Sequence, residues 1–201
     1  MFIWLASYPK SGNTLLRSML ASYFFSKDGN YFFGLIKNIK QFPHGGLFMK
    51  HGVDISNHNE TIKNYIKVQE TFNKKNSVQF LKTHSYLFNF NQQFSFTDFN
   101  NSLGVIYIVR DPRNIVNSLS KFKNTTIEQT ADFMIKSSGD GFTWTNTWSN
   151  NFHSWKTFKE HGKYMLIKYE DLITNRELIF LNVLKFIYKL NNSKFTIDKN
   201  K

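Results

Sequence analysis

The opening 25 residues constrain the fold most, because they predict a β-strand, a tight loop and an α-helix in direct succession. The apolar run 2–6 leads into the loop Ser7-Tyr8-Pro9-Lys10-Ser11-Gly12-Asn13-Thr14, after which apolar side chains recur at helical spacing. Such a loop directs backbone N–H groups and the positive end of the helix dipole at one point, which suits an anion. Lys10 adds a positive charge, Gly12 permits close approach of a ligand, and Asn13 or Thr14 can cap the helix. A plain strand-to-helix turn with a surface lysine would carry the same residues.

The composition excludes several kinds of site and leaves others open. The 201 residues suffice for one domain, and the formal net charge of +12 favours an anionic partner: nucleic acid, an acidic membrane surface or a phosphorylated small molecule. The chain has no cysteine, which excludes thiolate catalysis, cysteine-based zinc sites and disulfide bonds. No apolar run approaches the ~20 residues that a membrane span requires. We therefore expect a cytoplasmic protein without a membrane span.

Strands and helices alternate along the rest of the chain. Short apolar runs predict strands at 78–81, 104–109 and 164–167, and the run 104–109 is typical of a strand buried on both faces of a parallel sheet. This alternation predicts an α/β fold with three αβα layers and a mainly parallel central sheet. We expect one domain over 1–190 and a polar C-terminal tail over 191–201.

Two further helices are predicted from capping residues and apolar spacing. Asn59 is expected to cap a helix over 59–75, and tryptophans at spacings of three and four predict a core-facing helix over 143–161. Residues 89–102 are expected to form a loop or a broken helix, and 27–58 an irregular region beside a ligand site.

The segment after the 104–109 strand also predicts helices. Pro112 suits the first turn of a helix whose apolar face includes Phe122. A capping box is then expected where Thr125 or Thr126 is followed by Glu128 or Gln129.

Three histidines, His44, His51 and His58, recur at a spacing of seven and raise the question of a metal site. Glycines and a proline lie between them, so they do not share one helix, and no cysteine or close carboxylate pair completes a ligand set. We expect no metal here.

Charged or polar side chains stand at the ends of four predicted strands. Lys10, His84, Arg110 and Tyr169 each lie where a strand ends or just beyond it. Ligands of open α/β sheets bind beyond the carboxyl ends of the strands, so these side chains are expected to share one site. Two of the positions would suit two separate phosphate groups of one nucleotide.

An ordered set of segments resembles the sulfotransferases that depend on 3′-phosphoadenosine 5′-phosphosulfate (PAPS). The loop 8–14 is similar to the family's loop for the 5′-phosphosulfate, and Lys82-Thr83-His84 to its catalytic segment. Arg110-Asp111-Pro112-Arg113, with Ser118 eight residues after Arg110, is similar to its 3′-phosphate segment. Trp148 to Trp155 and Tyr169-Glu170-Asp171-Leu172 resemble two more landmarks, so the likeness spans about residues 2–190. It implies a P-loop nucleotide-kinase-like fold and transfer of a sulfuryl group to a hydroxyl or amine of a small molecule or glycan.

The resemblance also implies a role for each matching residue. His84 would be the general base, Lys82 would support the sulfuryl oxygens, and Lys10 would stabilise the leaving nucleotide. PAPS, as co-substrate, would be held without any metal. The implied nucleotide-binding residues are Lys10, the loop residues Ser11, Gly12, Asn13 and Thr14, the pair Arg110 and Ser118 on the 3′-phosphate, and Tyr169 beside the adenine.

The chain departs from the family's pattern in two places. Leu15 stands where many members have a tryptophan that stacks on adenine, and no Arg-Lys-Gly…Gly segment follows Leu172.

Two other classes of function remain open from the residues. A P-loop nucleotide kinase would need its glycines before the lysine and a magnesium carboxylate, for which Asp111 is the one attractive candidate. A nucleic-acid-binding or catalytically inactive nucleotide-binding protein would account for the positive charge, but no nucleic-acid-binding motif is present. We therefore expect no nucleic-acid partner, and the sequence predicts no oligomeric state.

Overall fold

A computed structural model describes residues 1–71, 79–90, 93–136, 145–196 and 198. Within these residues the chain forms a five-stranded parallel sheet in the order β2-β3-β1-β6-β7, with β1 in the centre, and this confirms the predicted fold class. The strands are β1 (Phe2–Ser7), β2 (Lys40–Gln41), β3 (Gln79–Thr83), β6 (Ser102–Val109) and β7 (Tyr164–Lys168). All six residues of β1 are buried, as an apolar run between two parallel neighbours requires.

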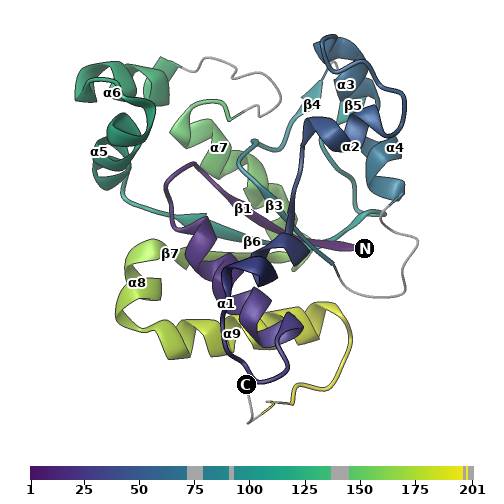
Figure 1. Ribbon diagram of the computed structural model, residues 1–201, viewed down its shortest axis with the longest axis vertical. Helices are drawn as coiled ribbons and strands as arrows, with labels where there is room; N and C mark the ends of the chain where they lie inside the picture. Colours follow the sequence, from purple (N-terminus) through teal and green to yellow (C-terminus); the bar gives the residue numbers. More distant parts are fainter. Residues whose placement is uncertain (72–78, 91–92, 137–144, 197, 199–201) are drawn as a thin grey trace.

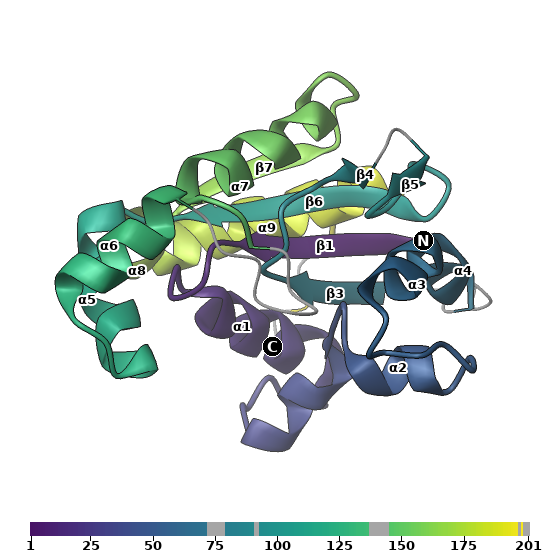
Figure 2. The ribbon, with the colours of Figure 1, turned by 90° about the horizontal axis from the view of Figure 1, so that it is seen from above.

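Helices cover both faces of the sheet, which gives the three expected layers (Figures 1 and 2). Alternate residues of β1 point to opposite faces: Phe2, Trp4 and Ala6 to one core, Ile3 and Leu5 to the other. The second core packs α1 (Asn13–Phe25), the 3-10 helix η1 (Phe33–Asn38), α8 (Tyr169–Thr174) and α9 (Arg176–Leu190). The first packs α2 (Gly45–Met49), α3 (His58–Lys63), α4 (Tyr65–Glu70), α7 (Trp148–Ser154) and η2 (Trp155–Lys159).

A cluster of buried aromatic rings forms the centre of the first core. The Trp4 side chain is fully buried, and its ring centroid lies 5.2 Å from that of Phe96 and 6.0 Å from that of Trp155. Its indole N–H donates to the hydroxyl of Ser102 at 2.7 Å, so the one polar atom of this side chain is satisfied. Much of the aromatic content of the chain therefore serves packing.

Helices α5 (Pro112–Lys123) and α6 (Ile127–Lys136) lie beyond the carboxyl end of β6 (Figure 1). Pro112 occupies the first turn of α5, as predicted, and the predicted capping box forms between Thr126 and Gln129. Buried side chains from both helices pack on Tyr8 of the first loop. This contact positions α5 and α6 against the loop.

The helix predicted over 59–75 is wrong in its start and its continuity. Asn57, not Asn59, is the cap, since its side-chain oxygen accepts from the backbone N–H groups of Asn59 and Glu60. The helix breaks at Asn64, whose side chain donates to the carbonyl of Glu60 at 2.9 Å and competes with the helical pattern. Residues 72–75 lie outside the described part of the chain.

The helix predicted over 143–161 is shorter and changes its type. It begins only at Trp148, with Thr147 as cap, and becomes a 3-10 helix at Trp155. Residues 143–144 lie outside the described residues. Trp155 and Phe158 are buried in the core, in line with the predicted tryptophan face.

The region 89–102, predicted as a loop or broken helix, contains a small hairpin instead. Strands β4 (Asn89–Phe90) and β5 (Phe94–Ser95) pair antiparallel, and the backbone N–H of Phe96 donates to the carbonyl of Phe88 at 2.8 Å. The aromatic side chain of Phe96 enters the core beside that of Phe88, which directly precedes the segment, and the polar composition of 89–102 concealed this burial. The region 27–58 is irregular, as expected: it contains the short elements η1, β2 and α2 and ends at the first residue of α3.

No helix in the described part of the chain is long and apolar enough to cross a membrane. Among these same residues, no cluster of three or more histidine or carboxylate side chains could hold a metal ion.

Candidate functional site

A cavity of about 630 Å³ opens at the carboxyl ends of β1, β3 and β6. Nine of the ten residues predicted for the site line it: Lys10, Gly12, Asn13, Thr14, Lys82, His84, Arg110, Ser118 and Tyr169. The tenth, Ser11, is fully buried within the loop. The topology thus brings together side chains from four separate segments of the sequence.

The loop after β1 turns sharply because two of its residues adopt left-handed backbone angles. Lys10 has φ of 65° and Gly12 has φ of 93°, and glycine alone adopts the second without steric cost. Gly12 is also the N-cap of α1, and this helix start receives no side-chain cap from the described residues. Its first N–H groups therefore remain available to an anion.

A buried hydroxyl in the loop adds a second available donor. The hydroxyl of Ser11 has no hydrogen-bond partner among the described residues, although its oxygen is buried. A buried polar group without a partner is costly, so a ligand that accepts a hydrogen bond here would be stabilised.

Asn13 departs from its expected part at the helix start. Its side-chain amide donates to the carbonyl of Leu5 at 2.9 Å and to the hydroxyl of Ser7 at 3.2 Å. The Asn13 side chain therefore ties the start of α1 back to β1 and does not cap the helix. Its backbone N–H remains part of the loop that faces the cavity.

His84 is held in one tautomer by its hydrogen bonds. Its Nδ1 lies 2.8 Å from the carbonyl oxygen of Ser7, which can only accept, so Nδ1 carries the proton and Nε2 is the basic nitrogen. The backbone carbonyl of His84 accepts from the Asn151 side chain at 2.8 Å. Burial lowers the pKa of His84 to about 3, assisted by the charges of Lys82 and Arg17 and opposed by the Ser7 carbonyl. The imidazole is therefore neutral at physiological pH.

Lys82 lines the same cavity wall as His84 and adds a second lysine, after Lys10. It is only 8% exposed, and its ammonium donates to the side-chain oxygen of Gln41 at 2.8 Å. Burial, and next the charge of Arg17, lower the pKa of Lys82 to about 8. The side chain thus stays mostly protonated at neutral pH.

Arg110 is fixed between the loop and Tyr169. One guanidinium nitrogen donates to the carbonyl of Lys10 at 2.9 Å, and the guanidinium carbon lies 4.3 Å from the centre of the Tyr169 ring. The buried Nε of Arg110 has no partner in the described part of the chain. The Tyr169 ring packs in turn against Gly12, where any side chain would collide with it. Arginine, ring and loop therefore form one packed unit with a free donor.

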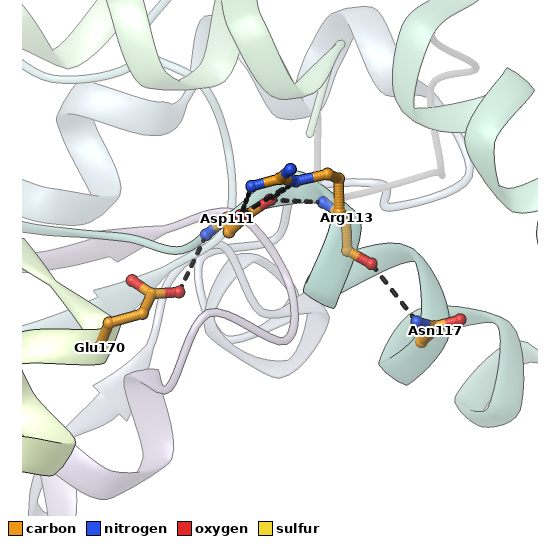
Figure 3. A network of polar contacts seen from close by, with 4 residues as sticks. All are labelled: Asp111, Arg113, Asn117 and Glu170. Atoms are coloured by element: carbon orange, nitrogen blue, oxygen red, sulfur yellow. Dashed lines mark hydrogen bonds and ion pairs between the residues drawn. The ribbon is translucent and has the colours of Figure 1, made fainter.

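A polar network holds the segments that carry Arg110 and Tyr169 (Figure 3). The backbone N–H of Asp111 donates to the Glu170 carboxylate at 3.2 Å, which links the residue after Arg110 to the residue after Tyr169. The Asp111 carboxylate caps α5 and pairs with Arg113 at 2.5 Å, and these bonds lower the pKa of Asp111. Asp111 is thus engaged in structure, and it does not line the cavity.

The cavity also contains side chains that the sequence did not suggest. The spacing predicts Phe122 on the apolar face of its helix, but this side chain is 73% exposed and lines the cavity, with the Lys10 ammonium 4.8 Å from its ring centre. The other additions are Pro9, Gln41, Leu119, Lys123, Phe133 and Thr145. The apolar spacing of α5 gave no sign that one of its phenylalanines faces a ligand site, and Gln41 lies in a region without clear periodicity.

Comparison with known proteins agrees with this arrangement. The model of the sulfotransferase domain family matches residues 2–197. The fold resembles mouse sulfotransferase SULT7A1 complexed with PAP, with a TM-score of 0.60 and 19% identity over 98% of this chain and 60% of that one. It also resembles retinol dehydratase in complex with androsterone and the inactive cofactor PAP, with a TM-score of 0.55 and 14% identity over 97% of this chain and 60% of that one. No curated protein sequence matches the chain. The chain spans about three fifths of the length of these solved structures, and likeness at such identity is one of fold.

Proposed function

The chain belongs to the sulfotransferase domain family, and on this basis we propose that it transfers the sulfuryl group of PAPS to a hydroxyl or amine of a small-molecule or glycan acceptor. One observation carries the proposal: a single cavity contains an uncapped helix start, a neutral histidine of fixed tautomer and a half-buried arginine whose buried Nε is a free donor. A reaction that moves a negatively charged group from a nucleotide needs this combination of anion binding and a base.

The loop would bind the 5′-phosphate end of the nucleotide. Backbone N–H groups of residues 11–14 and the positive end of the α1 dipole would face its oxygens. The buried Ser11 hydroxyl would gain the acceptor that it lacks. The Lys10 ammonium would move from the Phe122 ring to the oxygen that leaves with the nucleotide.

Arg110 and Ser118 would bind the 3′-phosphate. The free Nε–H of Arg110 offers a charge-assisted hydrogen bond to a phosphate oxygen, and Ser118 faces the same cavity from α5. Tyr169, which Gly12 and Arg110 hold in place, would line the adenine site. Tyr169 would thus contact the adenine in a chain where Leu15 replaces the stacking tryptophan of other members.

His84 would act as the general base. Its Nε2 would take the proton of the acceptor hydroxyl as the acceptor oxygen bonds to sulfur and the bond from sulfur to the phosphate oxygen breaks. The low pKa of His84 keeps Nε2 unprotonated in the free protein, and the negative charge of bound PAPS would raise this pKa toward neutrality. A positioned base whose pKa lies near the operating pH typically contributes ~10²–10⁴-fold to a rate. Lys82 would offset charge on the sulfuryl oxygens, as transfer of an anionic group requires.

The alternatives receive less support from the site. A P-loop kinase would use Asp111 for magnesium, yet this carboxylate pairs with Arg113 and does not line the cavity. A nucleic-acid-binding protein would account for the charge of +12, but not for a neutral histidine beside the buried Lys82. An inactive nucleotide-binding protein would need no ordered base. We therefore propose no nucleic-acid partner.

The nucleotide site is tested by thermal stabilisation with the desulfated nucleotide PAP and with ATP. We expect micromolar PAP to raise the melting temperature and ATP to have a smaller effect, because only PAP supplies a 3′-phosphate to Arg110. Lys10→Ala should lose the PAP response, whereas Lys121→Ala, at an exposed position of α5, should keep it. A response to ATP but not to PAP would contradict the proposal, as would an unchanged response in Lys10→Ala.

A further inference from the structure

Gln41 contacts Lys82 inside the cavity but belongs to none of the segments that identify the site. Its side-chain oxygen accepts from the Lys82 ammonium at 2.8 Å, and both residues line the cavity. We infer that Gln41 is a positioning residue, which holds the Lys82 ammonium toward the sulfuryl group without cancelling its charge. This inference rests on the proposed function.

The backbone fixes Gln41 opposite Lys82. The two residues are directly paired in the register of β2 and β3, and the next residue, Phe42, donates its N–H to the carbonyl of Lys82 at 2.9 Å. The Phe42 side chain is fully buried, so it anchors this short edge strand in the core. Arg17 of α1 donates to the carbonyl of Ile39 at 2.6 Å and holds the approach to β2. Gln41 itself is exposed, but these four anchoring points fix its backbone opposite Lys82.

A neutral acceptor at this position has a specific chemical consequence. An ammonium has three donors, and Gln41 occupies one, which leaves two for sulfuryl oxygens. The charged and titratable groups around Lys82 are Arg17 on α1, His84 beyond β3, and the other lining residues Lys10, Arg110, Lys123 and Tyr169. Among the described residues that line the cavity, none is Asp or Glu. A carboxylate at position 41 would thus be the first negative charge beside Lys82.

Three variants separate the effect of the hydrogen-bond acceptor at position 41 from the effect of a negative charge there. Gln41→Met keeps the length and removes the acceptor, while Gln41→Glu keeps the acceptor and adds a charge. Gln93→Glu adds the same charge at an exposed turn that does not line the cavity and serves as the control. Each is measured for kcat and KM with PAPS, for PAP affinity, and for the NMR titrations of His84 and Lys82.

We expect Gln41→Met to lower kcat on the order of tenfold, as for loss of a hydrogen bond to a charged group, with PAP affinity little changed. Gln41→Glu should lower kcat further and move both titrations to higher pH, since a carboxylate stabilises the protonated forms. Gln93→Glu should change neither. Wild-type kcat in Gln41→Met, or titrations that stay in place in Gln41→Glu, would overturn the inference. If the wild-type protein transfers no sulfuryl group, the proposed function fails, and the titrations still decide whether Gln41 sets the charge at Lys82.

Discussion

Replacement of Gly12 by alanine tests how the loop and the Tyr169 ring depend on each other. Gly12 has φ of 93°, where an L-residue costs ~1–2 kcal/mol. Its new methyl group would press on Cδ2 and lie 2.7 Å from Cε2 of Tyr169, so the ring must move by roughly 1 Å to restore ordinary contact. That movement separates the ring from Arg110, now 4.3 Å away. We expect a total loss of about 2–3 kcal/mol in the free energy of unfolding.

The functional consequence is measured by calorimetric titration with PAP beside urea unfolding. We expect Gly12→Ala to weaken PAP binding by about 10- to 100-fold, or ~1.4–2.8 kcal/mol, because the loop N–H groups, Arg110 and Tyr169 lose their common arrangement. Gly162→Ala is the matched control, since Gly162 has φ of 65° but nothing within 4 Å of its new methyl group. Gly162→Ala therefore has the cost of the left-handed backbone angle without any steric contact. Equal PAP affinity in the two variants would refute the argument that the loop and ring form one nucleotide site.

Two further predictions concern the groups that support His84. Tyr107→Phe removes the hydroxyl that donates to the side-chain oxygen of buried Asn151 at 2.7 Å and leaves that oxygen unpaired. Urea unfolding should therefore show a loss of ~1–3 kcal/mol in the free energy of unfolding. An unchanged stability would mean that this bond contributes nothing. Because the pKa of His84 falls from 6.5 to about 3 on folding, the unfolded chain binds more protons between these values. Stability should therefore fall as pH is lowered from 6.5 toward 3, by at most ~1.4 kcal/mol per pH unit from this group, and a slope that stays the same in His84→Asn would contradict the assignment.

The sequence predicts the parallel sheet because its signals are local. Residues 104–109 form a continuous apolar run. Such a run is sufficient for a strand that is buried between two neighbouring strands, here β1 and β7. The loop at 7–14 can also be predicted from local sequence, because its left-handed turn favours a glycine and Gly12 occupies that position. Helix boundaries are less predictable. Asn57 and Asn59 both suit a cap, and only the packed structure selects Asn57.

Residues that meet only after folding set the limit of prediction for the site. Lys10, His84 and Arg110 could be grouped from the sequence because parallel strands end at one edge. The supporting contacts could not be predicted: Gln41 contacts Lys82 from the neighbouring strand β2, and Asn151 donates to the His84 carbonyl from α7. Phe122 shows the opposite error, because its helical spacing matched that of core residues although its ring faces the cavity. Periodicity cannot distinguish an apolar side chain that packs inside from one that forms the wall of a site.

If this cavity delivers a sulfuryl group with His84 as the base, transfer must depend on the His84 imidazole. The most direct measurement is transfer of labelled sulfate from PAPS to a mixture of small alcohols, phenols and amines, with PAP binding measured on the same protein. We expect labelled product from the wild-type protein and from His161→Ala, which changes an exposed histidine. His84→Ala should bind PAP normally but lose at least ~100-fold in transfer. Transfer by His84→Ala at the wild-type rate would show that His84 is not the base.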